Sequence, residues 1–115
     1  MSKFNMTELA KLAAKVPSVK MAVISTAHVP ECDSEVLPTL SWDEQDEEGL
    51  NWLVCTGSGW IVLPREDEDW AEVLTHCGIS EPTIATITVL MEAGFDAINF
   101  DVGAATVDGL PLFDW

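Results

Sequence analysis

Two clusters of carboxylates are the residues of this sequence whose types and spacing most clearly indicate chemistry. The stretch DEQDEE (43–48) puts five acids into six positions, and REDEDWAE (65–72) holds five acids and one arginine. A fold does not need such clusters, because like charges repel and oppose compaction. Carboxylates lie about 5–6 Å apart at helical i, i+4 spacing and about 6.6–7 Å apart at alternate strand positions. Both spacings roughly match neighbouring backbone phosphates, so the clusters predict a surface that replaces nucleic acid in a basic groove.

The alternative is a solvated face that only keeps the protein soluble. A helix in the second cluster would place Glu68 and Asp69 one turn before Glu72, and such like-charge pairs cost stability. Trp42 and Trp70 adjoin the clusters and either anchor them to the fold or act as interface hot spots, where tryptophan is enriched. The predicted partner-binding residues are Trp42, Asp43, Glu44, Asp46, Glu47, Glu48, Glu66, Asp67, Glu68, Asp69, Trp70 and Glu72.

Other candidate chemistry is weaker. His28, Cys32, His76 and Cys77 suggest zinc by residue type, but their H-x₃-C and H-C spacings differ from the close pairs of structural zinc sites. The three cysteines are an odd set with wide spacing, which indicates reduced thiols and not a disulfide framework. The glycines of TGSGW have no lysine after them and predict a turn, not a phosphate loop. We therefore expect no metal, no cofactor and no enzymatic activity.

The charge distribution limits which classes of molecule the protein is expected to bind. The chain of 115 residues has a net charge of −15, yet four of its five basic residues lie within the first 20 positions. Residues 21–115 hold 19 acids and one arginine, a net −18. Such a body repels nucleic acid and anionic membranes, and it attracts basic surfaces. With no apolar run of bilayer length and no secretory signal, we expect a soluble cytoplasmic protein.

The elements that must position these residues follow from local patterns. At 48% hydrophobic residues the chain can form one ordinary domain with a real core. Apolar periodicity, prolines and glycines predict helices over 7–16 (capped by Thr7), between Pro30 and Pro38, over 67–78 and over 80–94 (capped by Ser80), and strands over 19–27, 50–56, 60–64 and 95–100, with a short final strand or tail in 105–115. The expected fold is a single α+β domain over 1–115, with a mostly antiparallel sheet of four or five strands, helices on one face, and a peripheral helix in 1–18.

Three motifs carry a resemblance. VISTAHV (23–29), GWIVLP (59–64) and the ending GFDAINFD…VDGLPLFDW (94–115) resemble an uncharacterised family of short bacterial proteins carried on plasmids, phages and other mobile elements. The sequence departs from the family pattern at Val102, where an acid is expected. The resemblance implies a genomic setting and no reaction. Mobile elements carry many small acidic proteins that block host restriction or CRISPR machinery.

We therefore expect a non-enzymatic acidic inhibitor of the anti-CRISPR or anti-restriction type. It would mimic DNA and bind a basic nucleic-acid-binding protein or complex of the host, without binding nucleic acid itself. One alternative is a small enzyme or ligand-binding protein with a site near His28, Asp101 and Asp108. A second is an acidic accessory protein of unknown role. His28 ends the first predicted strand, and its role is either functional or structural.

Overall fold

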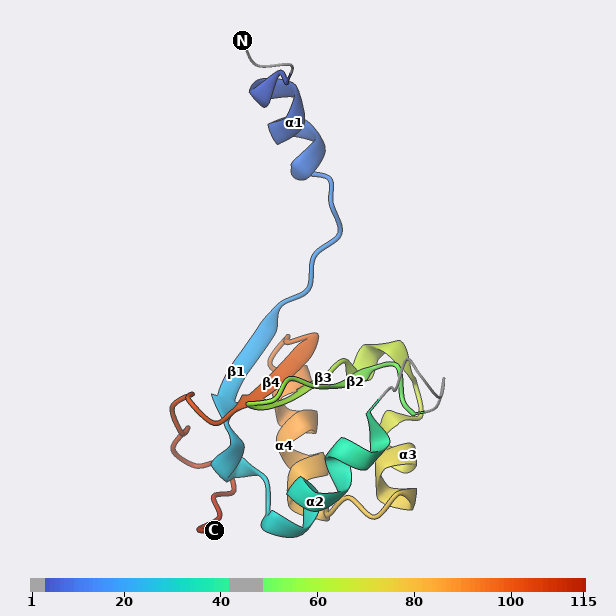
Figure 1. The fold of residues 1–115 in the computed structure, drawn as a ribbon, viewed down its shortest axis with the longest axis vertical. Coiled ribbons are helices and arrows are strands. Elements are labelled where there is room, and N and C mark those ends of the chain that lie inside the picture. The colour runs from blue at the N-terminus through green and yellow to red at the C-terminus, as the bar shows by residue number, and fades with distance from the viewer. Residues whose placement is uncertain (1–3, 42–48) are drawn as a thin grey trace.

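The fold is built on one four-stranded mixed sheet (Figure 1), in a computed structural model that describes residues 4–41 and 49–115. The strands are β1 (Met21–Ser25), β2 (Leu53–Cys55), β3 (Gly59–Val62) and β4 (Ala97–Asp101), in the order β1-β4-β3-β2. β1 runs parallel to β4, while the β4–β3 and β3–β2 pairs are antiparallel. The expected α+β class with a mostly antiparallel sheet is confirmed.

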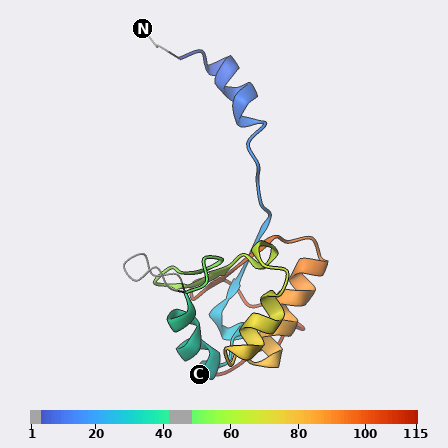
Figure 2. The same ribbon diagram turned by 90° about the vertical axis from the view of Figure 1, so that its right-hand side faces the viewer.

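Three helices cover one face of this sheet. They are α2 (Glu31–Leu40), α3 (Trp70–His76) and α4 (Glu81–Glu92), and Figures 1 and 2 show them together on the same side. Alternate strand residues point into the layer between sheet and helices, among them Ile24, Trp60 and Phe100. The helices add Leu74 and Ile87 to the same core. The described helices include none long and apolar enough to cross a bilayer.

Among the described α-helices, none packs on the other face of the sheet (Figure 1). Strand register places Val23, Asn99, Ile61 and Val54 side by side across the four strands. Val23 and Val54 are exposed, whereas Asn99 and Ile61 are half-buried. The sheet therefore presents one covered face and one open, largely apolar face.

Helix α1 (Met6–Ala13) stands away from the sheet and the three helices that cover it, which together form the body of the protein (residues 21–115). None of the residues of α1 is buried, and a turn at residues 14–16 followed by the irregular segment 17–20 connects it to β1. Its N-cap is Asn5, whose side chain accepts the backbone N–H groups of Thr7 and Glu8. The expected cap at Thr7 is therefore wrong by two positions, because asparagine caps at least as well as threonine.

Two further helices differ from expectation. Helix α2 does not end before Pro38 but runs through it to Leu40. The helix predicted over 67–78 is shorter, since the 3₁₀ turn η2 (Pro64–Glu66) precedes it and α3 begins only at Trp70. The carboxylate of Asp67 accepts the N–H of Asp69 at 2.8 Å and forms a local turn that competes with a helical start.

In 105–115, all of it described, the chain forms no strand and runs as an irregular tail, which is one of the two alternatives expected.

Candidate functional site

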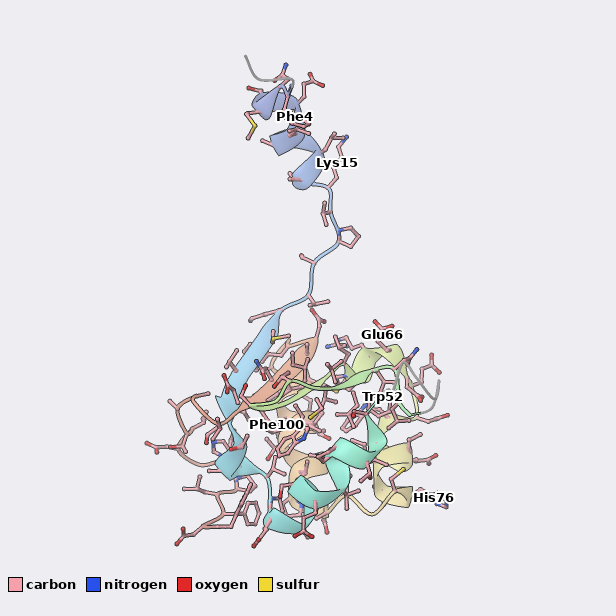
Figure 3. All side chains as sticks on the ribbon, in the orientation of Figure 1. Phe4, Lys15, Trp52, Glu66, His76 and Phe100 are labelled. Carbon is pink, nitrogen blue, oxygen red and sulfur yellow. The ribbon has the colours of Figure 1, made fainter. Side chains whose placement is uncertain are left out.

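The second acidic cluster lies on the outer side of η2 and α3. Glu66, Glu68, Asp69 and Glu72 are all exposed. In Figure 3 Glu66 and His76 lie on the outside, at the two ends of this segment, whereas Trp52 lies between sheet and helices. Because α3 begins at Trp70, Glu68 lies outside the helix and its expected helical pairing with Glu72 is wrong.

Trp70 and Leu74 hold α3 against the core. Trp70 is only 9% exposed, and Leu74 is fully buried in the same cluster as Trp52 and Trp60. Of the two roles expected for Trp70, the structure therefore supports that of an anchor beneath the acidic residues. Asp67 is half-buried and its carboxylate is engaged in the turn before α3.

Arg65, the one basic residue of 21–115, is directed away from the acidic cluster. Its Nε lies 2.7 Å from Oδ1 of Asp96, and this is the only ion pair within residues 4–41 and 49–115. Its guanidinium also donates to the carbonyl oxygen of Met91. The exposed carboxylates around α3 consequently have no cationic partner in the described part of the chain.

Two shallow depressions flank the exposed side of α3. One, about 540 Å³, is lined by Ala71, Glu72, Thr75 and His76. The other, about 370 Å³, adds Asp69 and Cys77 to Glu72 and His76. Glu72 and His76 thus form a ridge with a hollow on either side.

The first acidic cluster and Trp42 lie outside the described residues, but the chain on both sides of them is placed. Ser41 and Leu50 form a parallel bridge, and the Leu50 N–H donates to the Leu40 carbonyl oxygen at 2.7 Å. Two residues further on, the Trp52 carbonyl oxygen accepts the N–H of Leu63 at 2.8 Å. The segment therefore leaves and rejoins the fold at the base of the β2–β3 hairpin, the same base from which η2 starts.

His28 is fully buried and binds the C-terminal segment. Its Nδ1 lies 2.7 Å from the carbonyl oxygen of Pro111, and its Nε2 accepts the N–H of Val107 at 2.9 Å. A ring that donates through Nδ1 and accepts through Nε2 uses both nitrogens on the backbone. His28 is therefore a structural residue that fastens residues 107–111 to the end of β1.

Further hydrogen bonds join the same two segments. Ser25 donates its N–H to the Ala105 carbonyl oxygen, and Ala27 accepts the N–H of Phe113. The indole Nε1 of Trp115 donates to the Val29 carbonyl oxygen at 2.8 Å. The VISTAHV motif and the VDGLPLFDW ending, about 80 residues apart in sequence, are thus two halves of one structural unit.

This arrangement removes His28 as a base from the alternative site near His28, Asp101 and Asp108. Both nitrogens of His28 are occupied, Asp101 accepts the N–H of Gly103 with its Oδ1, and Asp108 is exposed. The described residues contain no group of three His, Cys, Asp or Glu side chains placed to hold a metal ion. A groove of about 290 Å³ does lie nearby, between Thr26, Trp60, Val102 and Trp115. Its described lining includes no titratable side chain.

Asp33 is a buried carboxylate that sequence reasoning did not find. It is fully buried in the first turn of α2, and its oxygens accept the N–H and the hydroxyl of Ser80 at 3.0 and 2.6 Å and the hydroxyl of Thr83 at 2.5 Å. Asp33 thereby supplies the cap of α4 from another element, where a negative charge is stabilised by the helix dipole. The one sequence signal is that Ser80 has threonine, not glutamate, at the capping-box position.

The fold and these contacts define a small α+β domain whose C-terminal segment is pinned to its first strand. The chain belongs to the DUF5983 family, a family of unknown function whose C-terminal domain model matches residues 21–115. That range contains the whole body and leaves α1 outside it. No curated protein and no solved structure matches the chain.

Proposed function

We propose that this protein is a non-enzymatic inhibitor that binds the basic nucleic-acid-binding surface of a host defence complex, of the anti-CRISPR or anti-restriction type. The observation that carries the proposal is the set of exposed carboxylates at Glu66, Glu68, Asp69 and Glu72, which have no cationic partner among the described residues. The one arginine of the body pairs with Asp96, so these carboxylates remain available to a basic partner.

The placement of these acids supports recognition of lysine and arginine. The core contacts of Trp70 and Leu74 hold α3 in place before a partner arrives, which reduces the ordering cost of binding. Each hollow beside the Glu72–His76 ridge offers room for a long basic side chain whose charged end meets a carboxylate. Arginine in particular pairs with carboxylates through two parallel hydrogen bonds.

The first acidic cluster belongs to the same proposal. The chain enters and leaves 42–48 at the base of the hairpin from which η2 starts. We infer that both clusters contribute to one acidic face, with Trp42 as a contact at its edge. The charge of −18 on residues 21–115 would speed encounter with a basic partner. An origin on a mobile element and action in the cytoplasm of the host bacterium complete the proposal.

The test is capture of a partner from host lysate at low salt, followed by titration of the purified partner. One variant neutralises Glu66, Glu68 and Glu72 to Gln and Asp69 to Asn, and leaves Asp67 to keep its turn. A second variant neutralises Asp43, Glu44, Asp46, Glu47 and Glu48. The matched control neutralises four other exposed acids, Glu31, Glu35, Glu81 and Glu92, on α2 and α4.

At least one cluster variant should weaken binding about tenfold or more, a loss of roughly 1.4 kcal/mol, while the control variant binds nearly as wild type does. The partner's own nucleic acid should compete with the protein for binding. Affinity should fall steeply as salt rises, chiefly through slower association, because the Debye length falls from about 10 Å at 0.1 M to about 3 Å at 1 M. If both cluster variants bind like the control, or the partner has no nucleic-acid-binding surface, the proposal is wrong.

A further inference from the structure

Helix α1 is amphipathic, and its apolar side packs on no other described element of the fold. At 3.6 residues per turn, Met6, Leu9 and Leu12 fall on one side, and Thr7 and Lys11 on the other. Met6 is 70% exposed, Leu9 41% and Leu12 61%. Isolated helices shorter than about 12–15 residues are marginal in water, and α1 has 8 residues. The helix therefore requires a surface on which its apolar side is buried.

The open face of the sheet is an apolar surface that would be stabilised by an apolar helix packed on it. Val23 is 54% exposed and Val54 41%, and Ile61 lies between them in the same row. At the centre of that row the Oδ1 atom of Asn99 is shielded from solvent and has no hydrogen-bond partner among the described residues. The exposed part of the row is therefore formed by the two valines.

The two surfaces also have opposite charge. Residues 1–20 carry four lysines and one glutamate, a net +3, against −18 for residues 21–115. We propose that α1 of one copy packs its apolar side on the open sheet face of a second copy, so that two copies exchange these N-terminal arms (residues 4–20). Lys11 on the polar side of α1 would then lie over an acidic body.

The start of β1 explains why the arm reaches a second copy. The N–H of Lys20 donates to Asp96 Oδ2 at 3.0 Å, and its carbonyl oxygen accepts the N–H of Asp96 at 2.8 Å. Its ammonium lies 4.6 Å from the centre of the Phe95 ring. These contacts continue the β1–β4 pairing to residue 20 and direct the chain away from its own body (Figures 1 and 2). The four residues 17–20 reach at most about 13–14 Å, and they carry α1 clear of its own body (Figures 1 and 2).

Electrostatics disfavours the other simple dimer, in which two open sheet faces pack directly on each other. That arrangement presses two bodies of −18 together within the Debye length of about 10 Å at 0.1 M salt. Arm exchange places a segment of net charge +2 (residues 4–20) against each body and lets the bodies stay apart. This association is independent of the inhibitor proposal, since it uses the opposite face of the sheet from α3.

The experiment measures the mass of the full 115-residue chain against concentration by sedimentation equilibrium. The arm variant is L9K/L12K and the sheet variant is Val54→Lys, both of which lessen the negative charge. The matched control is Val89→Lys on α4, at 45% exposure the counterpart of Val54 at 41%. Circular dichroism checks that each variant stays folded.

Wild type and the Val89→Lys control should dimerise, and the arm and sheet variants should each weaken the dimer at least about tenfold. A mixture of arm variant and sheet variant should recover a heterodimer, because the intact arm of one copy meets the intact sheet of the other. A monomeric wild type would overturn the proposal, as would an arm variant that dimerises like wild type through sheet-to-sheet packing. A sheet variant that dimerises as well as the control would also overturn it.

Discussion

His28 and His76, the two histidines of the chain, differ in what surrounds them. His28 is fully buried and bonded at both ring nitrogens to the C-terminal segment, while His76 is exposed at the end of α3. His28→Ala should lower the free energy of unfolding by about 2–4 kcal/mol, because two backbone groups lose their partner. Urea unfolding measures the loss, and His76→Ala is the matched control with an expected change within about 0.5 kcal/mol.

Amide hydrogen exchange separates this structural role from a catalytic one. In His28→Ala the amide of Val107 should exchange much faster than in wild type, whereas that of Ile98 at the centre of the sheet should follow global stability. An unchanged exchange rate at the Val107 amide would contradict the proposed role of His28 in holding the C-terminal segment.

Asp33 makes a second prediction at the scale of one residue. An amide cannot accept at both positions, so Asp33→Asn would turn an N–H₂ group toward donors on Ser80 or Thr83. The free energy of unfolding should fall by roughly 1.5–3 kcal/mol, the range for hydrogen bonds to a charged group. Thermal or urea unfolding checks this against Glu31→Gln, an exposed acid on the same helix. Equal stability of the two variants would show that the buried carboxylate does not hold α4.

At the scale of elements, the β2–β3 hairpin depends on one close approach. A Cβ on Gly59 would lie 1.6 Å from the carbonyl oxygen of Phe100 on β4, whereas a Cβ on Gly57 in the same turn would meet nothing within 4 Å. Gly59→Ala should therefore cost about 3 kcal/mol or more through overpacking and a displaced strand. Gly57→Ala, at φ +88°, should cost only about 1–2 kcal/mol. Comparable urea midpoints for the two variants would contradict this account of the GWIV motif.

Local signals in the sequence were sufficient for some elements and not for others. The Gly57–Gly59 turn and the helix after Ser80 were predicted correctly, because turn and helix-end residues act within a few positions. The expected side-chain cap at Ser80 is wrong, since Asp33 supplies the cap of α4. The start of α3 was misplaced because the side chain of Asp67 competes with the helix. For 105–115 the sequence allowed either a strand or a tail, because the backbone groups of this segment bond to His28 and to the loop after β1, more than 70 residues away. Such long-range partners leave no local pattern.

The candidate site was also predicted only in part from the sequence. Charge and exposure of Glu66, Glu68, Asp69 and Glu72 follow from composition, so sequence alone identified these residues. It did not show that Trp70 belongs to the core or that Arg65 pairs with Asp96, because both facts depend on tertiary contacts. The buried carboxylate of Asp33 was not recognised, since an acid in a first helical turn is ordinary.

At the scale of the whole molecule, charge is separated between the two parts of the chain. The arm projects a small positive charge, and the body concentrates its acids on the outer side of its helical layer and in its loops. The helical layer is where we propose a basic partner, and the open sheet face is where we propose the arm of a second copy. The two proposals respond to salt differently, because only partner binding depends chiefly on long-range attraction.

Uncompensated charge also predicts how stability depends on salt. Repulsion among the exposed acids opposes the compact state, so neutralising Glu66, Glu68, Asp69 and Glu72 should raise the free energy of unfolding by about 1 kcal/mol near 0.1 M salt, at a few tenths for each like-charge contact. Near 1 M salt the Debye length is about 3 Å, and the gain over wild type should largely vanish. Urea unfolding of both proteins at the two salt concentrations measures the difference. A gain that persists unchanged at high salt would show that the substitutions act through packing or helix propensity, and a loss at low salt would show that these carboxylates stabilise the fold.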